Sequence, residues 1–84
     1  MYEYYFMFRS VTAAQNALLM LRNEGIRCLM TAAPLVYKHG GCGNALLING
    51  SDAYKAAALM RRTGLNYQGA YRTKDGVLFE EAVL

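Results

Sequence analysis

The residues of this chain that are best suited to chemistry lie in one glycine-rich stretch, Gly40-Gly41-Cys42-Gly43-Asn44. The stretch places one thiol among glycines, directly after Lys38 and His39. Glycines leave a sulfur atom unshielded and let backbone N–H groups turn toward an anion, and nearby positive charge favours the nucleophilic thiolate. The pattern therefore predicts a reactive cysteine at Cys42. The supporting groups would be the side chains of Lys38 and His39 and the backbone amides of Gly41, Gly43 and Asn44.

Two other interpretations of this stretch are open. The glycines can serve only a turn, with Lys38 and His39 as ordinary solvated charges. A metal could be held by His39 and Cys42, but Cys28 alone remains to add a soft ligand, and the two cysteines lack the spacing of a zinc ribbon or a C-x-x-C dithiol site. We therefore expect no metal and no cofactor, and we expect Cys28 to be a buried core thiol.

The composition indicates one small folded domain. The chain has 84 residues, of which 55% are hydrophobic and 18% charged, so a disordered chain is excluded. The net charge of +3 comes from scattered basic residues, which is weak evidence for nucleic-acid binding. The apolar runs are far shorter than the roughly 20 residues that span a bilayer, and the first residues do not resemble a secretion signal. We expect a cytoplasmic protein that contacts neither membrane nor nucleic acid.

The hydrophobic patterns predict an alternating order of strands and helices. Alternation favours a strand at residues 3–9, and helical spacing follows to about Glu24, with Ser10 or Thr12 as the N-cap and Gly25 as the terminator. The remaining expected elements are a strand at 26–33 ended by Pro34, a loop at 34–43, a strand at 43–49, a helix capped by Ser51 and Asp52 and ended by Gly64, and a strand at 66–73.

This order predicts an α+β, ferredoxin-like β-α-β-β-α-β domain over residues 1–73, with a four-stranded antiparallel sheet and both helices on one face. The other face would be open and would carry Tyr5 and Met7. Contiguous apolar patches usually mark an interface, and a homodimer is the assembly we favour. The tail at 74–84 has a turn at Asp75-Gly76 and an apolar run, so it could add an edge strand or cover part of the open face.

An ordered set of short signals also gives the chain a family resemblance over about residues 4–72. The set comprises an aromatic first strand ending in Phe8 and Ser10, Glu24-Gly25-Ile26, Pro34, Cys42-Gly43 followed by Ala45, Gly64-Leu65, Gly69 and Tyr71. In these features the chain resembles the selenium/sulfur (Se/S) carrier protein-like family of small bacterial domains. It departs from that pattern in the loop with Tyr37, Lys38 and His39 and in the tail after Lys74.

The resemblance implies a ferredoxin-like fold and a Cys-Gly site, here Cys42 and Gly43, that carries sulfur or selenium as a persulfide or selenopersulfide. The leading hypothesis is thus a carrier that works between donor and acceptor proteins, without turnover of its own. The alternative is a non-catalytic regulatory module that binds a small ligand or a protein. A third hypothesis is RNA binding, but residues 43–49 lack the basic and aromatic series that base stacking needs.

Overall fold

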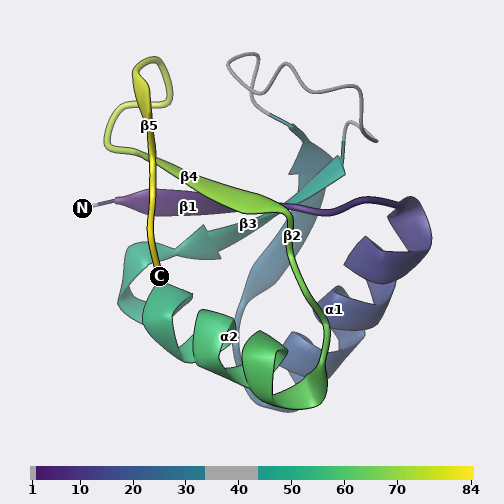
Figure 1. The fold of residues 1–84 in the computed structure, drawn as a ribbon. Helices are drawn as coiled ribbons and strands as arrows, with labels where there is room; N and C mark the ends of the chain where they lie inside the picture. Colours follow the sequence, from purple (N-terminus) through teal and green to yellow (C-terminus); the bar gives the residue numbers. More distant parts are fainter. Residues whose placement is uncertain (1, 34–43) are drawn as a thin grey trace.

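The computed structural model describes residues 2–33 and 44–84. Within these residues the chain forms five strands and two helices (Figure 1). In chain order they are β1 (Glu3–Met7), α1 (Val11–Asn23), β2 (Cys28–Ala32), β3 (Asn44–Asn49), α2 (Gly50–Thr63), β4 (Gly69–Thr73) and β5 (Phe79–Glu81).

The described strands form one sheet in the order β2-β3-β1-β4-β5, and each neighbouring pair is antiparallel. This register gives the sheet two distinct ends. The C-terminal ends of β1 and β2 meet the beginnings of β3 and β4 at one end, which we call the Asn44 end. The beginning of β1 meets the C-terminal ends of β3 and β4 at the other, which we call the Tyr2 end. The turn between β4 and β5 also lies at the Tyr2 end.

The expected class, an α+β domain with two helices and an antiparallel sheet, is correct, but the expected count of four strands is wrong. The fifth strand, β5, lies in the tail and pairs with β4, so that Phe79 is opposite Thr73. The hairpin between them turns at Gly76, whose φ of 78° is a left-handed conformation that glycine adopts without strain. A side-chain contact also holds β5 against β1, because the ring of Phe79 packs edge to face on that of Tyr5 with 5.4 Å between the ring centroids.

Both helices pack on the same side of the sheet (Figure 1). Three aromatic side chains from β1 and the residue after it, Tyr4, Phe6 and Phe8, form the centre of the core. The helices meet them mainly with small residues, since the buried set of α1 and α2 includes Ala14, Ala17, Ala53, Ala56 and Ala57. Alanine faces let the helix backbones approach the aromatic layer closely, which suits a core this small.

The opposite face of the sheet is only partly open. Tyr5 is half-buried beneath Phe79, and Leu29 on the edge strand β2 remains 60% exposed. Met7 shares this face with Tyr5, as alternation along β1 requires, but it is fully buried on the central strand rather than exposed. Exposure on this face is therefore concentrated toward β2.

The helix boundaries follow the predicted signals at three of four ends. The Ser10 side chain accepts a hydrogen bond from Ala13 N–H at 3.1 Å and caps α1, and Gly25 and Gly64 adopt positive φ after α1 and α2. The start of α2 differs, because Asn49 is the N-cap and accepts from Ser51 N–H at 3.0 Å. Gly50 explains the earlier start: its N–H donates to the carbonyl oxygen of Tyr2 at 2.9 Å, which draws the first helical turn against the chain before β1.

Candidate functional site

Of the predicted site residues, the structure describes Asn44 alone. Asn44 is the first residue of β3, half-buried and paired with Ala32 of β2, and its carbonyl oxygen accepts a hydrogen bond from Phe8 N–H at 3.4 Å. The other predicted residues, Lys38, His39, Gly41, Cys42 and Gly43, lie outside the described residues. The structure therefore describes the surroundings of Asn44, where β3 begins.

The Asn44 end also carries positive charge that the sequence analysis did not associate with Cys42. The hydrogen bond from Phe8 to Asn44 joins the end of β1 to the start of β3, so the exposed Arg9 follows directly beside the first residue of β3. The N-terminus of α1, with the positive end of its helix dipole, begins two residues later at Val11. The pairing of β1 with β3 brings Arg9 to this end of the sheet, so no local sequence signal could have associated it with Cys42.

Cys28 is a buried thiol, as the sequence predicted. It is 5% exposed, and its Sγ donates to the carbonyl oxygen of Leu18 at 3.8 Å. Burial raises the pKa of this thiol, and the opposing effect of the nearby Arg22 charge is smaller. Arg22 is itself directed to the backbone, since its Nη2 donates to the carbonyl oxygen of Cys28 at 3.1 Å. Cys28 is therefore held in the protonated, weakly nucleophilic form at neutral pH.

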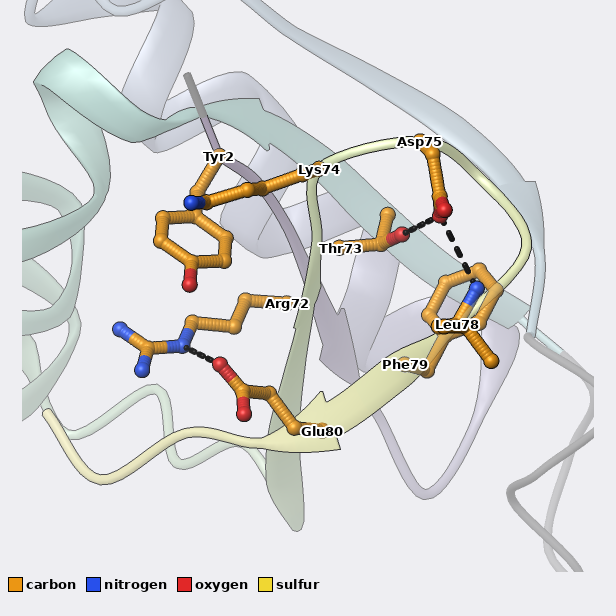
Figure 2. A pocket seen from close by; sticks show the side chains of 8 residues that line it. All are labelled: Tyr2, Arg72, Thr73, Lys74, Asp75, Leu78, Phe79 and Glu80. Carbon is orange, nitrogen blue, oxygen red and sulfur yellow. Dashed lines mark hydrogen bonds and ion pairs between the residues drawn. The ribbon is translucent and has the colours of Figure 1, made fainter.

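A pocket of about 290 Å³ lies at the Tyr2 end, between the chain before β1 and the β4–β5 hairpin (Figure 2). Arg72 crosses the ring of Tyr2 with its Cζ 4.3 Å from the ring centroid, and its Nε donates to Glu80 Oε1 at 2.6 Å. Hydrogen bonds with the side chains of Tyr4 and Glu80 raise the pKa of Arg72, so it remains cationic. Lys74 Nζ lies 5.1 Å from the same ring centroid.

The hairpin that closes this pocket is held in shape by Asp75. Its Oδ1 accepts hydrogen bonds from the backbone N–H groups of Val77 at 2.8 Å and Leu78 at 3.0 Å. These bonds lower the pKa of the Asp75 carboxyl, because they favour its ionised form. The buried Thr73 hydroxyl completes the turn by accepting from Gly76 N–H at 2.9 Å. The sequence predicts the turn at Asp75-Gly76, but it gives no sign of the pocket beside it.

Two classes of site receive no support from the described part of the chain. Among residues 2–33 and 44–84, no group of three histidine, cysteine or acidic side chains is placed to hold a metal ion. None of the helices in these ranges is long and apolar enough to cross a membrane.

Comparison with known proteins assigns most of the chain to one family. The family model described as "Putative Se/S carrier protein-like" matches residues 3–72, which run from the first residue of β1 into β4. No curated protein and no solved structure matches the chain. The matched range contains the Asn44 end of the sheet and both cysteines, whereas the β4–β5 turn and β5 lie beyond it.

Proposed function

The chain belongs to the Se/S carrier protein-like family, and we propose that it carries one sulfur or selenium atom on Cys42, as a persulfide or selenopersulfide, from a donor protein to an acceptor protein. In this role the protein would not turn over a substrate of its own. It would need one reactive thiol and a surface that two partners can approach in turn.

The state of Cys28 is the observation that carries this proposal. A carrier needs a thiolate that can reach a partner's sulfur atom. The chain has two cysteines, and Cys28 is buried, with its pKa raised by that burial. Cys42 is then the remaining candidate, and it is the cysteine that lies among glycines after Lys38 and His39.

The proposed chemistry is thiol exchange without net oxidation. The Cys42 thiolate attacks the terminal sulfur of a donor persulfide, a new S–S bond forms, the donor's S–S bond breaks, and the electron pair leaves with the donor's thiolate. An acceptor nucleophile then attacks the terminal sulfur, and Cys42 leaves as the thiolate. A donor selenopersulfide would transfer selenium by the same two displacements.

Positive charge at the Asn44 end supports the thiolate in this scheme. Lys38 and His39 precede Cys42 in the sequence, and the exposed Arg9 follows Phe8, whose N–H donates to the carbonyl oxygen of Asn44 at the start of β3. Nearby cations lower the pKa of a thiol by favouring its ionised form. They would also favour the persulfide anion that forms after transfer.

The finer features of the proposal follow from the same observations. We assign residues 1–73 to a ferredoxin-like domain, because β2, β3, β1 and β4 are adjacent in that order with both helices on one side, and we treat 74–84 as an added tail.

A carrier thiol must stay reduced, which favours the cytoplasm of a bacterial cell. The homodimer remains a proposal, and its interface would use the open part of the sheet face near Leu29 of β2.

Intact-mass spectrometry tests the carrier function directly. The reduced protein is exposed briefly to polysulfide, or to selenite with a thiol, beside the matched variants Cys42→Ser and Cys28→Ser. We expect the native protein and Cys28→Ser to gain the mass of one sulfur or selenium atom, and Cys42→Ser to gain none. Equal labelling of both cysteines in the folded protein, or an unmodified Cys42, would contradict the proposal.

A further inference from the structure

The pocket at the Tyr2 end consists almost entirely of residues that the family match does not include. Of its eight lining residues, Arg72 alone falls within residues 3–72. Tyr2 precedes the matched range, and the other six follow it in β4, β5 and the turn that joins them. The pocket therefore lies almost wholly outside the range that supports the proposed carrier function.

Two cations converge at one end of this pocket. Arg72 Cζ and Lys74 Nζ lie 4.3 and 5.1 Å from the centroid of the Tyr2 ring. The ring stabilises each cation, and both positive charges would attract an anion bound at this end of the pocket. The Arg72 guanidinium has more N–H donors than its bonds to Tyr4 and Glu80 use. In Figure 2 its terminal nitrogens point away from Glu80.

The acidic side chains of the pocket leave most of this positive charge available. The Asp75 carboxylate faces its own turn, where it accepts hydrogen bonds from Val77 N–H, Leu78 N–H and the Thr73 hydroxyl. Among the lining residues, Glu80 is then the one carboxylate that competes for Arg72, and its side chain is 55% exposed. An exposed pair of this kind is weak, so a ligand anion can share or replace it.

The lining and the volume of the pocket limit what it can hold. Leu78 and Phe79 lie at the end away from Tyr2 (Figure 2), so the wall is cationic on one side and apolar on the other. A volume of about 290 Å³ suits a small molecule. We infer that the pocket binds a small organic anion, with a phosphate or carboxylate group at the end that carries Arg72 and Lys74 and an apolar body toward Leu78.

Titration of the ¹⁵N-labelled protein, followed by NMR, tests this inference. Phenyl phosphate and benzoate are the two anionic probes, benzyl alcohol is the neutral probe of similar size, and inorganic phosphate is the anion without an apolar body. We expect saturable shifts of the backbone resonances from Arg72 to Glu80 with at least one anionic probe, and the tighter of the two identifies the head group. Benzyl alcohol should cause none, and inorganic phosphate should bind more weakly than phenyl phosphate.

Three charge variants on exposed positions complete the test. Lys74→Gln should weaken binding of the anionic probe about fivefold, and Glu80→Gln should tighten it by a similar factor, because an exposed charge contributes modestly and Glu80 competes for Arg72. Lys55→Gln removes the same charge from the exposed surface of α2 and should leave affinity unchanged.

The inference is overturned by shifts that do not saturate, by equal effects of the two lysine variants, or by inorganic phosphate binding as tightly as phenyl phosphate. Cys42→Ser should bind the probe normally, so failure of the carrier function leaves this result intact.

Discussion

The two ends of the sheet obtain their chemistry in different ways. The groups proposed for the carrier site are nearly consecutive in the sequence, from Lys38 to Asn44, and they lie in the range that the family model matches. At the Tyr2 end, the groups come from residue 2, from β4, from β5 and from the turn between these strands, and nearly all lie outside that range. One end depends on a local motif, and the other depends on the fold to assemble it.

This difference follows from the chemistry proposed for each end. Covalent transfer needs a single reactive atom, and a few neighbouring residues can tune the pKa of one thiol. Anion binding in water needs several weak contacts to converge, because each exposed charge contributes little alone. The Tyr2 end should therefore be sensitive to changes in backbone fit that leave Cys42 unaffected. The three predictions below test that independence, from the largest expected effect to the smallest.

Two glycines at opposite ends of the sheet provide the sharpest contrast. A Cβ on Gly50 would collide with the carbonyl oxygen of Tyr2, whereas a Cβ on Gly69, at the Asn44 end, would meet nothing within 4 Å. We expect Gly50→Ala to lower the free energy of unfolding by about 2 kcal/mol, as overpacking typically does. Gly69→Ala should change it by less than about 0.5 kcal/mol. Urea denaturation measures both, and similar values for the two variants would refute the tight fit between α2 and Tyr2.

The features that the sequence predicted correctly are those with strong local signals. The two helices and the terminators Gly25 and Gly64 follow from spacing and from the φ that glycine allows. Cys28 was placed in the core because it alternates with apolar neighbours in a strand. The Cys42 motif was also recognised locally, and its reactivity remains a prediction.

The features that the sequence did not reveal depend on contacts between distant segments. The tail sequence allows either an edge strand or a cover for the open face, and β5, with three residues of which two are glutamates, is too short for its own pattern to decide. Pairing with β4 makes it the edge strand. The cap of α2 was placed too late because the hydrogen bond from Gly50 to Tyr2 could not be foreseen. The stacking of Arg72 on Tyr2 likewise joins segments from opposite ends of the sequence.

Substitution of Phe79 tests whether the Tyr2 end can be destabilised without an effect on Cys42. Its ring packs edge to face on Tyr5, and its strand holds Glu80 beside Arg72. We expect Phe79→Ser to lower the free energy of unfolding by about 1.5 kcal/mol, through lost apolar burial and the lost aromatic pair. Probe binding at the Tyr2 pocket should weaken with it. The control Val77→Ser changes a side chain that is 74% exposed and should have little effect. A loss of sulfur loading on Cys42 in Phe79→Ser would show that the two ends are coupled.

Asp75 should give the smallest effect, one that depends on pH. Its pKa in the folded protein lies below the ordinary value of about 3.9 because backbone N–H groups of Leu78 and Val77 bind the ionised form. A carboxyl with a lowered pKa stabilises the fold above its unfolded pKa, and that stabilisation disappears as the pH falls through the folded value. The amide resonances of Val77 and Leu78 should therefore titrate with a midpoint below 3.9 or so, and Asp75→Asn should abolish that transition. A midpoint at the ordinary value would mean that the turn is not held by this carboxylate, and the hairpin that positions Lys74 and Glu80 would then need another source of order.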